Sequence, residues 1–146
     1  MIKTIVLSMC LALSALSLNA LAQDVPQYTD GPVTELDYIH VEYGHFVEYD
    51  DWLKSTWKPT MEAMKKAGLI IDYKDVTATP TTLDQPNTIL MVTFKDGAAA
   101  LDKRVEQDEV ANKVIGSTEF QNKARVARNQ YRQVLGIEYV REVILK

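Results

Sequence analysis

The residues best suited to chemistry in this chain lie close together, between positions 40 and 52. His40 and Glu42 are two positions apart, so on an extended strand the imidazole and the carboxylate point to the same face. Such a pair suits a general base with an orienting carboxylate. His40 is therefore the candidate catalytic residue, and Glu42 is its candidate partner.

Four residues around His40 are candidate ligand-binding residues: Glu42, Tyr43, His45 and Trp52. Gly44 separates the strand from a following helix, so Tyr43, His45 and Trp52 lie around a turn. Large aromatic side chains suit an apolar, planar ligand in a gap between helix and sheet. The alternative is that the aromatic residues fill a core and that His40 is hydrogen-bonded at an interface.

The composition leaves no set of residues for a metal or another cofactor. The chain has two histidines, and its single cysteine, Cys10, lies in an N-terminal apolar run. A zinc site needs three or four protein ligands. Neither a glycine-rich phosphate loop nor a G-x-S-x-G motif is found. We therefore expect no metal, no cofactor and no serine nucleophile.

The net charge excludes one large class of partners. The 146 residues carry 16 basic and 20 acidic side chains, which gives a formal net charge of −4. Binding to nucleic acid requires clustered lysine and arginine residues facing phosphates. We expect no nucleic-acid partner.

The N-terminal residues predict export. Lys3 precedes an apolar run, and Ala20 and Ala22 form the small-residue pattern that signal peptidase recognises. We assign residues 1–22 to a signal peptide, 23–33 to a flexible leader and 34–146 to one folded domain. The expected location is the periplasm or the outside of the cell, without membrane association after cleavage.

The pattern of apolar residues predicts alternating strands and helices. Strands are expected at 35–43, 69–76, 88–94 and 137–145. A helix over 45–67 carries an apolar row that we expect in the core: Phe46, Tyr49, Leu53, Trp57, Met61 and Met64. Pro59 removes a backbone donor and should kink or split this helix near Lys58.

The second half of the chain is also helical between its strands. Residues 98–115 predict two short helical pieces, and a last helix begins after Gly116. An apolar row along the last helix continues through Tyr131 to Val134. Arg125, Arg128 and Arg132 form a basic row that could hold a carboxylate or phosphate. We interpret this row as a solvated face.

The order of elements predicts a ferredoxin-like β-α-β-β-α-β domain of the α+β class, a four-stranded antiparallel sheet with helices on one face. The segments 35–43 and 88–94 are apolar on both faces, although an open sheet face should be polar in a monomer. A second copy could cover the open face in a sheet-to-sheet homodimer, which we favour. Alternatively, the segment 98–115 covers it.

Several stretches together resemble the dimeric α/β-barrel superfamily of ferredoxin-like proteins. They are "DYIHVEYGHFVEY", "AGLIIDYKDV", "NTILMVTF" and the strand that follows "ARVARNQYRQV". The resemblance spans about residues 34–145 and implies a ligand site between sheet and helices. The superfamily includes cofactor-independent monooxygenases, haem-degrading enzymes, isomerases and stress proteins. Since no motif of a single branch is present, the resemblance assigns no catalytic residue.

Three functions are compatible with these residues. The first is binding of a small apolar or aromatic ligand between the sheet and the helix over 45–67. The second is a cofactor-independent monooxygenase or isomerase in which His40 moves a proton. The third is a structural or partner-binding homodimer without a site.

Overall fold

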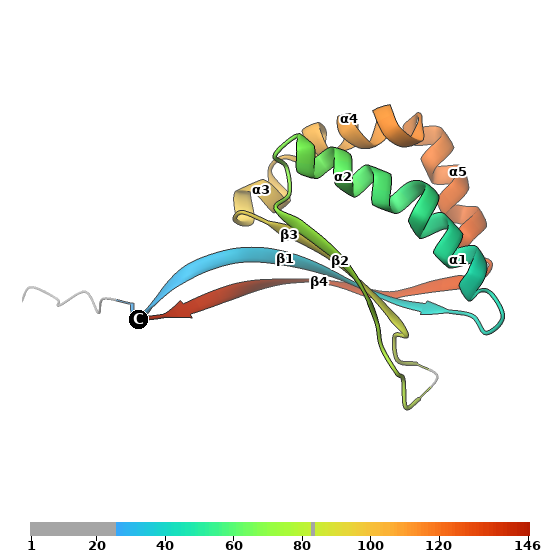
Figure 1. Cartoon of the computed structure of the whole chain (residues 1–146), viewed down its shortest axis with the longest axis horizontal. Coiled ribbons are helices and arrows are strands. Elements are labelled where there is room, and N and C mark those ends of the chain that lie inside the picture. The colour runs from blue at the N-terminus through green and yellow to red at the C-terminus, as the bar shows by residue number, and fades with distance from the viewer. Residues whose placement is uncertain (1–25, 83) are drawn as a thin grey trace, which may run out of the picture.

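The computed structural model describes residues 26–82 and 84–146, so the predicted signal peptide lies outside the described residues. The elements follow one another in the order that the sequence predicts (Figure 1). They are β1 (Tyr28–Val41), α1 (Phe46–Trp52), the π-helix η1 (Leu53–Trp57), α2 (Lys58–Lys66), β2 (Asp72–Thr77), β3 (Thr88–Phe94), α3 (Gly97–Leu101), α4 (Arg104–Ile115), α5 (Thr118–Arg128) and β4 (Arg132–Leu145).

The four strands form one sheet in the order β2-β3-β1-β4, and every neighbouring pair is antiparallel. The central strands are β1 and β3, as the ferredoxin-like topology requires. Asp37 on β1 lies between Leu90 on β3 and Ile137 on β4. The predicted fold class is therefore confirmed.

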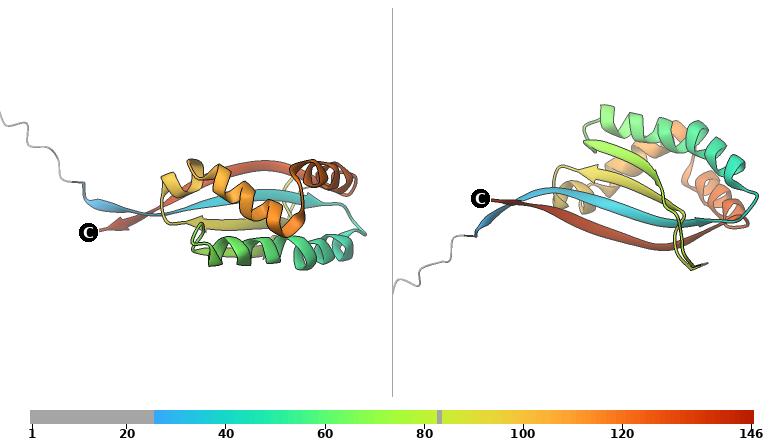
Figure 2. Two further views of the ribbon diagram at one scale, coloured as in Figure 1. Left: turned by 90° about the horizontal axis from the view of Figure 1, so that it is seen from above. Right: turned by 60° about the horizontal axis from the view of Figure 1, so that its bottom comes forward.

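All the helices lie on one side of the sheet, and the other face of the sheet is open in the chain (Figures 1 and 2). The predicted helical segment 98–115 forms two pieces, α3 and α4. The alternative in which this segment covers the open face is wrong, because α4 packs against α2 on the helical side. The helix α3, which precedes α4, contacts β1 and β3.

The strands β1 and β4 are longer than predicted. β1 begins at Tyr28, so residues 28–33, which we assigned to the leader, belong to the strand. Pro32 is tolerated because the β1–β4 register shifts between Asp30 and Val33, and a bulge needs no ladder donor at that point. Gly31 permits the close approach of β4, since a Cβ there would lie 2.9 Å from the Cβ of Glu142.

The helix predicted over 45–67 is divided by one π-helical segment. α1 passes into η1 at Leu53, and α2 begins at Lys58 with Pro59 in its first turn. The predicted interruption near Lys58 is thus confirmed. Proline lacks the N–H that an α-helix needs there, and the wider π turn, in which the Lys58 N–H reaches the Leu53 carbonyl, accommodates this loss.

The core lies between the sheet and the divided helix. Its most buried members come from facing positions of β1, β3, α1 and α2: Ile39, Val41, Tyr49, Leu53, Met61, Leu90, Val92 and Phe94. The predicted apolar row is confirmed from Tyr49 onward, but Phe46 is 42% exposed. It lies in the first turn of α1, beyond the edge of the core.

The last helix is shorter than the apolar pattern predicts. α5 ends at Arg128, and β4 already begins at Arg132, because Arg132 and Gln133 pair with Val41 and His40 of β1. Tyr131 and Val134 therefore lie outside the helix. No residue of α5 is fully buried, so this helix stands off the sheet instead of sealing it (Figure 1).

Candidate ligand-binding cavity

A cavity of about 530 Å³ lies between the divided helix, α5 and the sheet, and we call it the wedge cavity. Strand β1 contributes Glu35, Asp37 and Ile39, and the divided helix contributes Trp52, Trp57, Thr60 and Met61. Its far wall is formed by Phe120, Ala124, Arg125 and Arg128 of α5, and its floor is completed by Leu90, Arg132 and Ile137. The cavity exists because α5 and α1 diverge above the sheet.

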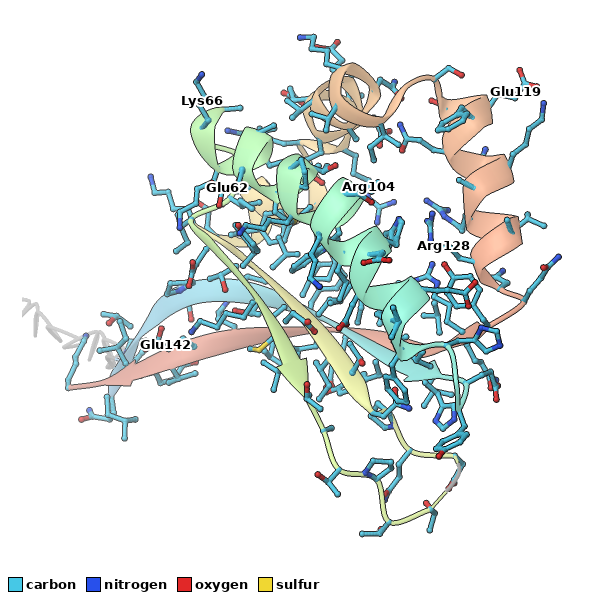
Figure 3. The ribbon with its side chains drawn as sticks, turned by 45° about the vertical axis from the view of Figure 1, so that its right-hand side comes forward. Glu62, Lys66, Arg104, Glu119, Arg128 and Glu142 are labelled. Carbon is cyan, nitrogen blue, oxygen red and sulfur yellow. The ribbon has the colours of Figure 1, made fainter. Side chains whose placement is uncertain are left out.

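Arg128 spans the cavity from α5 to α1. Its guanidinium carbon lies 4.3 Å from the centroid of the Trp52 ring, which is a cation–π contact. Figure 3 shows the side chain on the inner side of α5, in the space in front of α1 and α2. Burial, and then the charge of Arg132, lower the pKa of Arg128. The site therefore holds this cation against an electrostatic cost.

Arg132, the first residue of β4, is 8% exposed. Its guanidinium carbon lies 5.3 Å from the Trp52 ring centroid and 6.0 Å from that of Tyr49. Among the described residues, neither Arg128 nor Arg132 belongs to an ion pair within 4.0 Å. A buried guanidinium without a carboxylate partner is costly, so an anion in the cavity would stabilise it.

Two carboxylates of β1 face the same cavity and differ in their environments. Glu35 accepts a hydrogen bond of 2.5 Å from the Tyr139 hydroxyl. Asp37 has an oxygen, Oδ1, that is buried without a hydrogen-bond partner. Burial and the neighbouring Glu35 charge raise the pKa of Asp37 to about 6, although Arg132 opposes this change. Asp37 thus exchanges a proton near neutral pH.

The unsatisfied polar atoms of the described part of the chain all gather at this place. The buried side-chain atoms without a hydrogen-bond partner are Asp37 Oδ1, Tyr49 OH, Trp52 Nε1, Arg128 Nε and Arg132 Nε. Four of the five residues line the cavity, and Tyr49 packs on Trp52 with ring centroids 5.4 Å apart. Buried polar groups are nearly always paired in folded proteins. Their concentration here indicates a binding site.

The tyrosine in this group is a donor across the physiological range. Tyr49 is 1% exposed, and burial raises the pKa of its hydroxyl to about 12 although Arg132 opposes this change. The phenol therefore stays protonated. Trp52, Arg128 and Arg132 line the cavity itself, and their N–H groups are donors for a ligand that carries acceptor oxygens.

The residues selected from the sequence are dispersed around this end of the fold. Trp52 lines the wedge cavity. His40 Nδ1 lies 3.0 Å from the Gln85 carbonyl oxygen, away from the cavity walls. Tyr43 is 97% exposed. His45 stacks on Tyr131, with ring centroids 5.6 Å apart, and forms a short contact with Glu48. The structure thus brings only Trp52 of this set into the cavity.

Glu42 takes a separate position. It lines a neighbouring hollow of about 480 Å³ that shares Arg125, Arg132 and Val134 with the wedge cavity. His40 does not line this hollow. The strand ends at Val41, so Glu42 no longer follows the alternation that was expected to place it beside His40.

The structure also reveals functional residues that sequence reasoning missed. Asp37 shares a strand face with Ile39 and Val41, which are both buried, and a carboxylate in such a series was a readable signal. Arg128 and Arg132 belong to the row that we interpreted as solvated, and this interpretation is wrong. Arg132 lies on the strand and is buried, and Arg128 faces inward.

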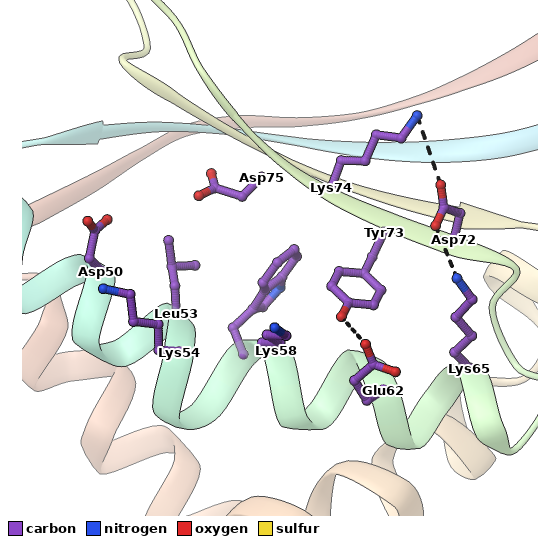
Figure 4. A pocket seen from close by; sticks show the side chains of 11 residues that line it. Asp50, Leu53, Lys54, Lys58, Glu62, Lys65, Asp72, Tyr73, Lys74 and Asp75 are labelled. Atoms are coloured by element: carbon purple, nitrogen blue, oxygen red, sulfur yellow. Dashed lines mark hydrogen bonds and ion pairs between the residues drawn. The ribbon is translucent and has the colours of Figure 1, made fainter.

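A second hollow of about 510 Å³ lies along the outer edge formed by β2 and the divided helix (Figure 4). Several of its polar and charged groups pair with one another. Lys65 Nζ lies 3.2 Å and Lys74 Nζ 3.9 Å from the carboxylate of Asp72, and the Tyr73 hydroxyl donates to Glu62. None of the buried unpaired side-chain atoms in the described part of the chain belongs to a residue of this hollow, in contrast to the wedge cavity.

Within residues 26–82 and 84–146, no three His, Cys, Asp or Glu residues are grouped as a metal site. None of the helices in these ranges is both long and apolar enough to cross a membrane.

The arrangement of strands and helices can be compared with solved structures. Two dimeric ferredoxin-like proteins from uncultured marine organisms superpose with a TM-score of 0.50, each over 81% of this chain. They are 9% and 11% identical to it and are covered over 98% and 90% of their own lengths. The chain has the ferredoxin-like fold of these proteins. This result confirms the predicted ferredoxin-like fold.

A third similar structure is that of HapK from Hahella chejuensis. It is 10% identical, with a TM-score of 0.49 over 75% of this chain and 91% of its own. No protein-family model matches this ferredoxin-like chain, and no curated protein matches it.

Proposed function

We propose that this ferredoxin-like protein binds a small planar ligand with an anionic oxygen group in the wedge cavity. The observation that carries the proposal is the gathering of five unpaired buried polar atoms around one cavity. Four of them belong to donors, so the missing partner is an acceptor. A carboxylate provides the oxygens that guanidinium groups bind most strongly.

The charges of the walls support an anion. Arg125, Arg128 and Arg132 line the cavity and face two carboxylates, Glu35 and Asp37. With a pKa of about 6, Asp37 is still partly protonated close to neutral pH. The cavity therefore holds an excess of positive charge in a chain that is acidic overall. Attraction between charges is strengthened where water is largely excluded.

The shape and the apolar walls support a planar body. The volume of about 530 Å³ lies within the range of roughly 300–1,000 Å³ that small-molecule sites usually have. Trp52 and Trp57 present ring surfaces, and Met61, Leu90 and Phe120 surround them. An aromatic ring attached to a carboxylate would fill both the apolar and the charged parts.

His40 has less support as the centre of an enzyme than the wedge cavity has as a binding site. Its Nδ1 is engaged by the Gln85 carbonyl, and it contacts neither the cavity nor Glu42's hollow. A purely structural domain is the second candidate. It would leave the five unpaired atoms without an explanation.

We further propose that the protein is an exported homodimer, with the open faces of two sheets packed together. The open face carries Leu36, Tyr38, Ile89 and Met91 of the central strands, which are only partly covered in the single chain. The two marine neighbours are described as dimeric. The export rests on the signal-peptide pattern over residues 1–22.

Titration with benzoylformate, an aryl ring joined to a carboxylate, tests the binding site. Isothermal calorimetry should show saturable binding to the parent protein and no binding of the matched amide, benzoylformamide. Arg132→Met should weaken binding at least about tenfold, as expected for a lost charge-assisted hydrogen bond. Arg141→Met is the control, because Arg141 pairs with Asp30 outside the cavity. Equal binding of acid and amide would contradict the proposal.

A further inference from the structure

We infer that Asp37 is a general base for proton abstraction from a carbon next to the carbonyl group of the bound ligand, which makes the protein a keto–enol tautomerase or isomerase. This inference rests on the proposed binding site and assigns to it a reaction class and a catalytic residue. Asp37 lines the wedge cavity together with Arg128 and Arg132. Its Oδ1 is buried and accepts no hydrogen bond, so no protein donor engages this oxygen of the carboxylate.

The surroundings of Asp37 separate it from an ordinary structural carboxylate. Its backbone is fixed in the centre of the sheet, between Leu90 and Ile137. Arg132 has no ion-pair contact with it within 4.0 Å among the described residues. Burial and Glu35 together raise its pKa to about 6. A base of this strength is effective near neutral pH, because it is deprotonated yet more basic than a solvated carboxylate.

The groups that face Asp37 divide the work of such a reaction. On its own strand Glu35 adds a negative charge, and from β4 Arg132 adds a positive one. Tyr49 on α1 lies close enough to Asp37 for the negative charge of Asp37 to contribute to the raised pKa of the Tyr49 hydroxyl, which stays protonated. Arg128 and Arg125 face the cavity from α5. These donors are available to stabilise a negative oxygen that develops in the transition state.

The proposed step balances without any further reagent. The Asp37 carboxylate takes a proton from the carbon adjacent to the carbonyl. The electron pair of that C–H bond forms a C=C bond, and the π pair of the carbonyl moves to its oxygen as an enolate. Arg132 and Arg128, which line the cavity, hold that oxygen. Protonation of the enolate oxygen gives the enol. In D₂O the Asp37 carboxyl group exchanges its proton for a deuteron, and delivery of that deuteron to carbon gives isotope exchange.

The site retains polar atoms that the fold does not pair. Asp37 Oδ1 and Arg132 Nε are buried without a hydrogen-bond partner, and an apolar side chain at either place would avoid the cost of burying that atom. Retaining both of them next to a cavity is typical of catalytic sites, where perturbed pKa values and unpaired polar groups gather.

Proton exchange on phenylpyruvate tests the inference with the full chain. This probe carries an aryl ring, a carboxylate and an enolisable methylene group, and proton NMR in D₂O follows the loss of the methylene signal. The parent should accelerate exchange above the buffer rate. Asp37→Asn should lower this acceleration about 100-fold, the lower bound usual for a general base. Asp75→Asn is the matched control, because burial also raises the pKa of Asp75 but Asp75 lies outside the wedge cavity.

Benzoylformate separates this inference from the binding proposal, since it has no adjacent C–H to remove. Binding of benzoylformate by both parent and Asp37→Asn, with exchange lost only in the variant, supports both. Binding without accelerated exchange in the parent, or with equal exchange in Asp37→Asn, overturns the catalytic role and leaves the binding site intact. Absence of benzoylformate binding overturns both. Circular dichroism of each variant confirms that it is folded.

Discussion

The guanidinium carbon of Arg128 on α5 lies 4.3 Å from the centre of the Trp52 ring on α1. The contact joins two helices that otherwise diverge above the sheet, and α5 has no fully buried residue of its own. The stacked pair therefore forms one wall of the wedge cavity and fixes the distance between its sides. The guanidinium group of a surface arginine is normally hydrated, whereas that of Arg128 packs on the Trp52 indole ring.

Replacing Trp52 should impair ligand binding more than folding. In Trp52→Leu the planar wall and the cation–π contact are lost together, and such contacts contribute about 0.5–2 kcal/mol. We expect the affinity for benzoylformate to fall roughly tenfold in calorimetry. Phe46→Leu is the matched control, because Phe46 belongs to the same helix but is 42% exposed. An equal loss in both variants would contradict a specific role for the Trp52 ring.

Removing the charge of Asp37 should stabilise the protein at high pH. Because burial raises the folded-state pKa from 3.8 to about 6, the contribution of Asp37 to stability is full below pH 4. It is lost as the pH rises through about 6, where the buried carboxylate ionises. Asp37→Asn should therefore match the parent near pH 4 and exceed it by about 1–2 kcal/mol at pH 8, allowing for screening.

Urea unfolding at several pH values measures this difference. Asp75→Asn serves again as the comparison, since burial and the charge of Asp50 also raise the pKa of Asp75. If the free energy of unfolding of the parent instead rises relative to that of Asp37→Asn between pH 4 and pH 8, the carboxylate is stabilised in the folded state. That result would also argue against its role as a tuned base.

Glu35 should tune the proton affinity of Asp37. Its negative charge raises the pKa of Asp37, so Glu35→Gln should move the titration of Asp37 to lower pH. The pH profile of phenylpyruvate exchange should move in the same direction, since the base is then deprotonated at lower pH. Carbon NMR of the Asp37 carboxyl measures the first change. Glu138→Gln is a suitable control, because Glu138 bonds to Tyr38 and does not line the cavity.

A charge on the open face of the sheet should dissociate the proposed dimer. Met91 lies at the centre of β3, opposite Leu36 of β1, and a lysine at this position would be desolvated between two sheets. We expect light scattering to report a dimer for the parent and a monomer for Met91→Lys. Lys54→Glu, on the helical side, should leave the dimer intact. A monomeric parent would contradict the proposed assembly.

The fold was predictable from local patterns because its elements follow simple periods. The segment 88–94 forms β3 with the predicted bounds, since its apolar residues and flanking turn residues define both ends. Pro59 likewise located the interruption of the long helix, because a missing N–H has a local effect. The ends of β1 and β4 were missed, because long-range pairing across a bulge decides them.

The candidate site was less predictable, because it is assembled from distant segments. His40 and Glu42 attracted attention as a short-range pair, but β1 ends between them. Asp37 meets Arg132 only through the pairing of β1 with β4, and Arg128 meets Trp52 only where two helices face each other. Helical periodicity suggested that the arginines lie on one helix, whereas α5 ends at Arg128.

The π-helical segment η1 acts as a phase shift between the two halves of one helix. An α-helix turns about 100° per residue, so winding these same residues as a regular α-helix, without the wider π turn over Leu53–Trp57, would rotate α1 by about that angle relative to α2. Tyr49 and Trp52 would then leave Arg128 and Arg132, although the sheet and α2 would be unchanged. The positions of the groups around the cavity thus depend on the π-helical winding at Leu53–Trp57 as well as on the residues that line the cavity.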